Sequence, residues 1–438
     1  MKSILKAFSA VALTGVMVLP VLADDATTST DAKDVKDLKK VVEDQGINYV
    51  ETAQKGITLS GYVDVSYTEQ FGGRGTGFGA GQANLHQFDV NNNNFNVQAV
   101  KIALEKALPD KNEWAAGFRI DTIYGADARF LGDSGFNNQS TGSGSSTSSV
   151  NGNSTFALEQ ALVKFRIPVG NGLDIYAGKF VTFLGYEVIE SPANPNFSRG
   201  LLFTNAIPLT HTGVYADYKF NDTFEAKFGV VDGWNNSVSF NNGSDESFGG
   251  KAITGQLTIN APGKNANITQ SFIYAPQNDG AALSAGAPTN GPGLAPVGDN
   301  PVFVYDIWGN WTPTFDKSGN TTLGFNLDYG NDSYNWYGAA LYAQYKLTKV
   351  ITLAGRGEYL HADANAGKYG AGGITNPVTG ILSPESQDDF SLTATISFAI
   401  WDNLLTRAEY RFDALPSGTT GTQATTQNEI SLEAVYSF

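Results

Sequence analysis

The last twelve residues, QNEISLEAVYSF (427–438), have the pattern of a β-strand with one apolar face and one polar face. Asn428 is followed on the apolar face by Ile430, Leu432, Ala434, Tyr436 and Phe438. A final strand that ends on an aromatic residue is typical of outer-membrane barrels, and we interpret Tyr436 and Phe438 as the signal for the barrel-assembly machinery. This stretch predicts a transmembrane β-barrel in a bacterial outer membrane.

The first 23 residues have the pattern of a secretory signal peptide. Lys2 and Lys6 precede an apolar run that is followed by the small-residue cleavage pattern Val21-Leu22-Ala23. A transmembrane helix is the alternative, but the run is short and is broken by Gly15 and Pro20. A helical span needs about 20 apolar residues. We therefore expect an exported protein without a helical anchor.

The composition fits an exported barrel. Charged residues make up 16% of the chain, against roughly 25% in soluble domains, whereas Gly, Tyr and Phe are abundant. The chain has no cysteine, so backbone pairing and burial must stabilise it without disulfides. A closed barrel pairs all of its backbone groups. The net charge of −15 argues against nucleic acid as a partner.

Sixteen segments alternate between apolar and polar residues, as half-buried strands do. They are residues 57–69, 94–108, 113–124, 155–167, 172–181, 209–220, 223–234, 250–260, 266–275, 301–312, 321–329, 335–347, 350–361, 388–399, 402–413 and 427–438. Tight turns alternate with long loops between them, which predicts short periplasmic turns, long extracellular loops and two periplasmic termini. The connectors 313–320 and 330–334 fit this rule least well, because the first is long for an inner turn and the second is short for an outer loop. The predicted fold is an all-β, antiparallel, up-and-down barrel of about 16 strands over residues 57–438.

A barrel of this size leaves an aqueous lumen, so we expect charged side chains to face inward and aromatic residues to gather at both ends of the strands. A large soluble β-sandwich or β-helix is the alternative, but it explains neither the alternating loop lengths nor the terminal Phe438. Acidic and basic side chains on the predicted inner face nearly balance. The predicted lumen-wall residues are Asp64, Arg119, Asp121, His211, Asp217, Lys219, Arg356, Glu358, Arg407, Glu409 and Arg411.

The connector 182–208, TFLGYEVIESPANPNFSRGLLFTNAIP, differs from the Gly-, Ser- and Asn-rich outer loops because it is rich in Phe, Leu and Ile. Such a loop would be costly in solvent, so we expect it to fold into the lumen as a constriction. Packing on the outer rim at a subunit contact is the alternative. The predicted constriction residues are Tyr186, Glu187, Glu190, Asn196 and Arg199.

The same region carries a resemblance. The stretch GYEVIESPANPNFSRGLLFTNAIPLTHTGV (185–214), followed by FGVVDGW (228–234), resembles the OmpL-like β-barrel porin family of Gram-negative bacteria. The resemblance is specific over the centre of the chain and implies an outer-membrane porin. It gives weight to Tyr186, Glu187, Asn194, Asn196, Ser198, Arg199, Thr210, His211, Thr212 and Gly213. The family is defined by its fold more than by a substrate, so the solute stays open.

Residues 24–56 precede the predicted barrel. Asp31 is placed to cap a short helix with an apolar stripe that includes Val35 and Leu38. A helix this short is marginal alone. The segment is either a disordered leader or a contact between copies in a homotrimer, an assembly that the resemblance permits.

The sequence gives no sign of an enzyme. A Ser-His-acid site built on His211 and Asp217 fails because residues six apart on a strand are about 20 Å apart. The chain contains no G-x-S-x-G motif and no cluster of histidines or cysteines for zinc, and we predict no cofactor and no metal.

The predicted function is passive diffusion of ions and small hydrophilic solutes, with lipid and lipopolysaccharide as surroundings. A second reading is a sugar-selective channel with Tyr186, Phe197 and Trp336 as a sliding surface. A third is a plugged structural or adhesive barrel.

Overall fold

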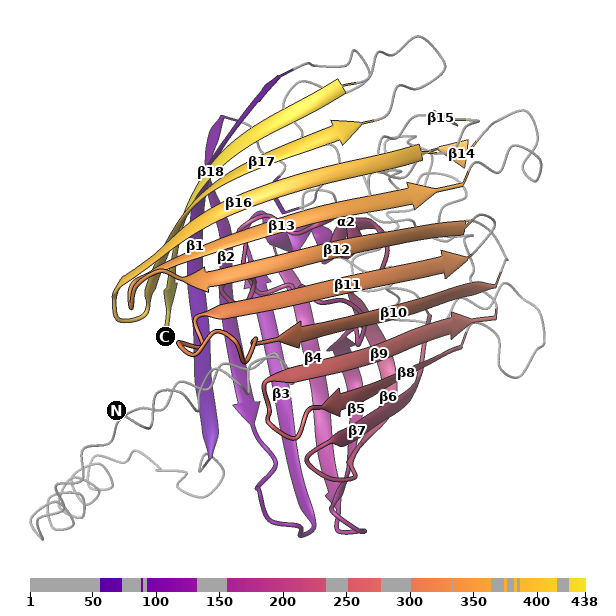
Figure 1. Ribbon diagram of the computed structural model, residues 1–438. Helices are drawn as coiled ribbons and strands as arrows, with labels where there is room; N and C mark the ends of the chain where they lie inside the picture. The colour runs from indigo at the N-terminus through magenta and orange to yellow at the C-terminus, as the bar shows by residue number, and fades with distance from the viewer. Residues whose placement is uncertain are drawn as a thin grey trace, which may run out of the picture. The chain divides into compact units, whose positions relative to one another are not determined.

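Sixteen long strands pair into one closed ring in the computed structural model (Figure 1). The structure describes residues 56–72, 88–89, 93–131, 156–233, 251–276, 301–331, 335–363, 374–375, 382–383, 387–415 and 425–438. The strands of the ring are β1 (Ile57–Gly72), β2 (Asn94–Lys106), β3 (Ala115–Tyr124), β4 (Phe156–Ile167), β5 (Leu173–Val181), β6 (Thr210–Lys219), β7 (Phe224–Val231), β8 (Ala252–Asn260), β9 (Ala266–Ala275), β10 (Val302–Trp311), β11 (Thr321–Asn331), β12 (Asn335–Lys346), β13 (Ile351–Ala362), β16 (Gln387–Trp401), β17 (Leu404–Leu415) and β18 (Thr425–Ser437). Each pairs antiparallel with its neighbours in chain order.

The predicted fold class is confirmed, and each of the sixteen predicted strands corresponds to one strand of the ring. The sequence did not predict the two-residue strands β14 (Ile374–Thr375) and β15 (Leu382–Ser383), which pair with each other within a predicted outer loop. Among the described residues, no helix is both long and apolar enough to cross a bilayer. The predicted signal peptide and leader lie outside the described residues, apart from Gly56.

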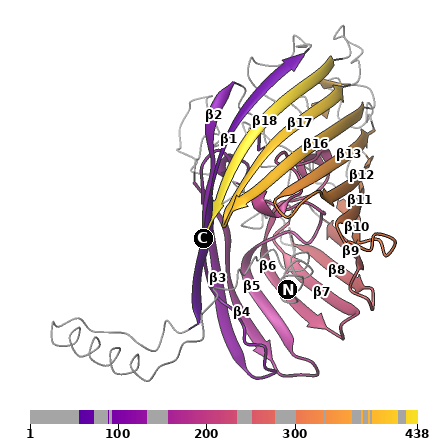
Figure 2. The ribbon, with the colours of Figure 1, turned by 60° about the vertical axis from the view of Figure 1, so that its left-hand side comes forward.

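The ring closes where the first and last strands meet, side by side in Figure 2. Tyr62 pairs with Ser437, and the register continues to Gly72 opposite Gln427. The backbone amide of Phe438 donates to the oxygen of Gly61 at 2.9 Å, and the amide of Gly61 donates back at 3.0 Å. A side chain at position 61 would collide with the oxygen of Lys101 and the ring of Phe438. The predicted terminal strand therefore completes the ring.

The two faces of each strand differ in the way that the alternation predicts. On β17, Arg407, Glu409 and Arg411 are buried, whereas Tyr410 between them is 44% exposed. Exposed aromatic side chains gather at the turn ends of the strands, and they include Trp114, Phe165, Phe220, Phe224, Trp311, Trp401 and Phe438. An apolar outer face with aromatic residues at its edges is typical of a barrel surrounded by lipid.

Strict alternation is interrupted on β2 and β4, among other strands. On β2, Gln98 and Ala99 are both buried. On β4, the pairing with β3 slips between Asp121 and Thr122, which leaves Glu159 without a partner residue and buries it next to Gln160. A β-bulge of this kind changes the direction of a side chain. Here it adds a carboxylate to the inner face.

Candidate functional site

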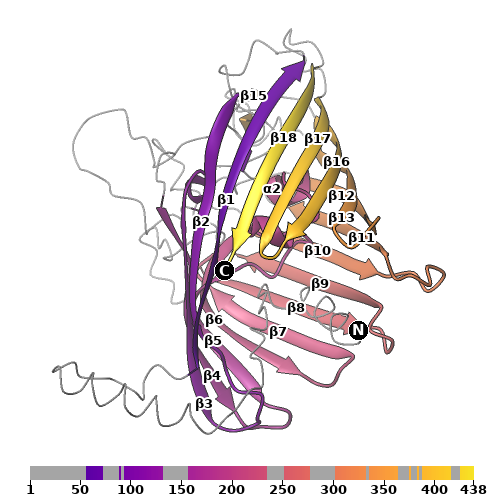
Figure 3. The ribbon, with the colours of Figure 1, turned by 90° about the vertical axis from the view of Figure 1, so that its left-hand side faces the viewer.

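The connection between β5 and β6, residues 182–209, lies inside the ring of strands. It includes η3 (Ser191–Ala193) and α2 (Leu201–Asn205), and every residue of α2 is buried. Figure 3 shows α2 enclosed by the strands. We call residues 182–209 the connecting segment. The wall side chains that hydrogen-bond it on β2, β8–β13 and β16–β18 are Lys101, Gln256, Ser271, Asp306, Asn310, Asn326, Trp336, Arg356, Thr395, Arg407, Glu409 and Glu433.

Local features of the sequence fit this path. Gly185 has a φ of 96°, a conformation that other residues rarely adopt, and Pro192 lies in the first turn of η3. Gly200 leads into α2, and a side chain there would come within 2.1 Å of Glu358 Oε1 and 2.8 Å of Glu187 Oε2. Only a glycine lets the backbone approach these two carboxylates so closely.

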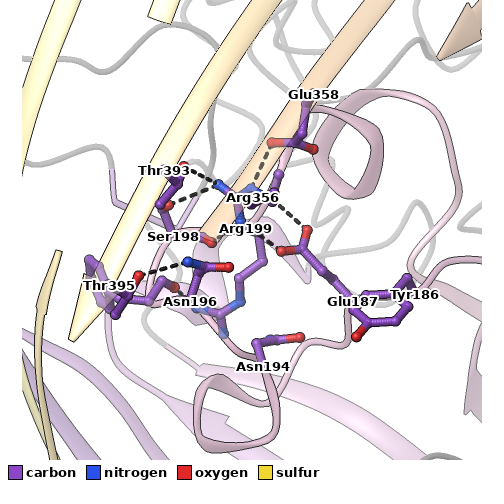
Figure 4. A network of polar contacts seen from close by, with 12 residues as sticks. Tyr186, Glu187, Asn194, Asn196, Ser198, Arg199, Arg356, Glu358, Thr393 and Thr395 are labelled. Carbon is purple, nitrogen blue, oxygen red and sulfur yellow. Dashed lines mark hydrogen bonds and ion pairs between the residues drawn. The ribbon is translucent and has the colours of Figure 1, made fainter. Parts of the chain in front are cut away.

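Arg356 on β13 links the wall to the connecting segment (Figure 4). Its guanidinium donates to Glu187 Oε1 at 2.7 Å, to the oxygen of Ser198 at 2.6 Å and to Thr393 Oγ1 at 3.1 Å. Its Nε forms an ion pair with Glu358 Oε2 at 2.7 Å, and neither side chain of that pair is exposed. A buried guanidinium is stable only with partners of this kind, so Arg356 fixes the connecting segment in place.

Glu187 is therefore an anchor and not an open charge. Besides Arg356, it accepts the backbone amide of Gly200 at 2.6 Å. Burial raises the pKa of Glu187, the neighbouring Glu358 carboxylate raises it further, and the Arg356 guanidinium and the Gly200 amide oppose the rise. Its charge is enclosed by protein.

Two neighbouring strands hold the middle of the connecting segment. On β17, Arg407 donates to the backbone oxygens of Ser191, Asn194 and Asn196 at 2.8 to 3.3 Å. It also pairs with Glu433 on β18 at 3.1 Å. The Asn194 and Asn196 carbonyl oxygens lie outside helices and strands, so the guanidinium supplies donors that secondary structure does not.

Glu409, also on β17, accepts the backbone amides of Phe197 and Ser198 at 2.7 and 3.0 Å. The hydroxyl of Thr395 donates to the same carboxylate at 2.7 Å and accepts a hydrogen bond from the side-chain amide of Asn196 at 2.7 Å. The carboxylate thus takes charge-assisted bonds from the backbone that it faces.

Lys101 on β2 holds Glu190. Its ammonium lies 2.5 Å from Glu190, 2.8 Å from Glu159 and 3.2 Å from Asp121. Oxygens of these three carboxylates lie within 4.8 Å of one another, a grouping that could hold a metal ion, and the ammonium lies close to all three. Burial opposes ionisation of Glu190, but the Lys101 ammonium outweighs it and holds the pKa of Glu190 below its ordinary value.

The remaining predicted constriction residues are also bound within the protein. Tyr186 is half-buried, donates to Asn310 Oδ1 at 2.8 Å and stacks on Tyr342. Arg199 is 1% exposed, lies 3.6 Å from Asp127 and covers the ring of Phe88. Two of the three aromatic side chains of the predicted sugar-sliding surface are closed to solvent, because Phe197 and Trp336 are 1% and 0% exposed.

The surroundings of the other predicted wall residues differ. Arg119 makes three hydrogen bonds to Asp121, and Arg411 is buried among the carboxylates of Asp89, Asp413 and Glu429.

Asp64 is fully buried, and both of its oxygens lack a hydrogen-bond partner among the described residues. His211 contacts Thr182 Oγ1 and the oxygen of Gly233. Lys219 lies at the turn end of β6, where its 58% exposed side chain pairs with Asp222.

Lys101 and Glu159 were missed as site residues by sequence reasoning. The irregular alternation of their strands was a signal that the inner face changes there. It did not reveal that the β-bulge would bring Glu159 next to Lys101, since that contact depends on the pairing of separate strands.

Comparison with known sequences identifies one family. The sequence model described as "Putative beta-barrel porin-2, OmpL-like" matches residues 56–438. No curated protein sequence matches the chain.

Solved structures with the same fold are outer-membrane channels. The channel DcaP of Acinetobacter baumannii has a TM-score of 0.55 at 10% identity over 87% of this chain and 97% of its own. OmpF of Salmonella typhi, in complex with daunomycin, has a TM-score of 0.53 at 13% identity over 87% and 97%. An anion-selective porin from Comamonas acidovorans has a TM-score of 0.52 at 11% identity over 87% and 99%. At these identities the likeness extends to the fold alone.

Proposed function

Because this chain belongs to the OmpL-like β-barrel porin family of the bacterial outer membrane, we propose that it is a passive diffusion channel for ions and small hydrophilic solutes. The connecting segment 182–209 is its constriction. A ring of this many strands is too wide for wall side chains alone to fill, so whatever lies within it sets the size of the passage. The observation that carries the proposal is the attachment of this segment to wall strands on several sides of the ring.

The position of the anchoring bonds supports a fixed constriction. Arg356, Arg407 and Glu409 bind backbone groups of the segment, so its path does not depend on flexible side chains alone. A passage of constant width favours diffusion without a conformational cycle. Homotrimer formation, contact with lipopolysaccharide and recognition by the assembly machinery stay predictions.

Single-channel current through purified, refolded protein in a planar bilayer tests the proposal. The full-length mature barrel should give stable steps, and a variant without residues 24–55 should give the same steps. A variant with residues 187–204 replaced by a Gly-Ser linker should give larger ones. Well-folded barrels that carry no current would overturn the channel proposal and favour the plugged structural barrel.

A further inference from the structure

The inner face of the barrel is covered unevenly. On β13, Arg356 and Glu358 have no exposed side-chain area, and the inner residues of β16–β18 are also buried. By contrast, the charged inner residues near the turn ends of β4–β7 keep some exposure, at 17% for Arg166 and 14% for Lys227. We call this slightly exposed part of the wall the open band. Its charged residues are Arg166, Asp174, Asp217, Glu225 and Lys227.

The strand register brings these charges together. Arg166 on β4 pairs with Asp174 on β5, which pairs with Asp217 on β6, which pairs with Lys227 on β7. Side chains directly opposite on antiparallel strands lie about 5 Å apart at Cβ. The row is therefore one continuous line of charge across four strands.

Within this row, Asp217 is the carboxylate that lacks a bonded partner. Asp174 is neutralised by Arg166, whose Nε and Nη2 both donate at 2.7 Å. Lys227 donates to Gln256 Oε1 at 3.0 Å and lies 3.8 Å from Glu225. Among the described residues, the Asp217 carboxylate accepts no hydrogen bond and forms no ion pair. The five charged residues of the open band, two cations and three carboxylates, sum to −1, whereas Lys164 farther along β4 is bound to Glu105 of β2. Asp217 is the least compensated carboxylate of the band.

We propose that the aqueous passage runs along the open band and that the Asp217 carboxylate makes it prefer cations. This inference rests on the proposed channel function and adds the position of the passage and a selectivity-determining residue. Ions follow the part of the wall that water reaches, because the side chains beneath the connecting segment are enclosed. A fixed negative charge there raises the local concentration of cations and lowers that of anions.

The reversal potential in a KCl gradient tests the role of Asp217. Asp217→Asn removes the charge with little change in shape and should lower the cation-to-anion permeability ratio roughly two- to fivefold, as one unit charge does for an ion a few ångströms away in water. Asp217→Glu should keep the ratio. The matched control is Asp222→Asn, because Asp222 loses the same charge at an exposed turn outside the ring.

Cysteine accessibility tests the position of the passage separately. The chain has no cysteine, so each introduced thiol is the sole target of a cationic methanethiosulfonate reagent. Asp217→Cys should react and lose conductance, whereas Thr393→Cys, beneath the connecting segment, should not. Equal reaction at the two positions, or equal permeability ratios for Asp217→Asn and Asp222→Asn, would overturn the inference while leaving the channel intact. Absence of current from the folded wild type would instead overturn the proposed function itself.

Discussion

The inner wall has two regions that use the same residue types in different ways. On β13, β16, β17 and β18, arginines and carboxylates are enclosed and bind the connecting segment. On β4–β7, similar residues near the turn ends keep about 14–17% of their side-chain exposure and mainly bind one another. Burial raises the energy of an unpaired charge, so the enclosed charges must be matched bond by bond, whereas water tolerates an excess in the open band. Charge in the first region holds the connecting segment in place, and we propose that charge in the second acts on solutes.

The substitution with the largest expected effect on stability is Arg356→Met, which leaves the carboxylates of Glu187 and Glu358 buried without the guanidinium that pairs with them. We expect a loss of about 3–5 kcal/mol in the free energy of unfolding, measured by urea titration of the refolded barrel. The same variant should show larger and less regular current steps because the segment is less firmly held.

The triple variant Arg356→Met, Glu187→Gln and Glu358→Gln also removes the two buried carboxylates that lost their cation, so it should recover part of that stability. If Arg356→Met were as stable as wild type, ion pairs would not be what stabilises the enclosed region.

A smaller effect is expected for Glu409→Gln. The amide side chain has a single oxygen to accept the amides of Phe197 and Ser198, and it loses the charge that strengthens both bonds. We expect a decrease of about 1.5–3 kcal/mol in the free energy of unfolding, from the same urea titration. Glu225→Gln, in the open band, is the matched control and should have a much smaller effect. Equal losses at the two sites would remove the distinction between the regions.

The smallest expected effect is a change of stability with pH. The pKa of Glu190 is lowered by Lys101, so the folded state holds its charge more strongly than the unfolded state, whose pKa is near 4.5. This stabilisation is complete above pH 4.5 and is lost as the pH falls through the lower pKa of the folded state.

Urea midpoints measured from pH 7 to pH 3 should therefore converge for wild type and Glu190→Gln at the acidic end. The difference between the two curves reports on the acidic cluster as a whole, because Glu190, Asp121 and Glu159 share the Lys101 ammonium. A difference that stays constant with pH would contradict the ion pair.

The connecting segment marks the limit of prediction from sequence. Its apolar composition and its Glu and Arg residues predicted a structured loop, and Gly185 and Pro192 were visible in the sequence. The partners of Glu187 and Glu190, however, are Arg356 and Lys101, far away in the chain and on different strands. No local pattern reveals such a pairing, so the sequence did not show that the predicted constriction residues Glu187 and Glu190 bind cations of the wall.

The sequence by itself determined the barrel. Its evidence was the two-residue alternation, the alternating turn and loop lengths and the last strand that ends on an aromatic residue. These are local properties, and backbone geometry converts them directly into strands. Only the tertiary structure decided which inner charges are enclosed and which are reached by water. That outcome depends on strand register, on the β-bulge at Glu159 and on the path of residues 182–209 across the ring. Each of these joins residues distant in the chain, and burial, which sets the energy of a charge, exists only once they have met.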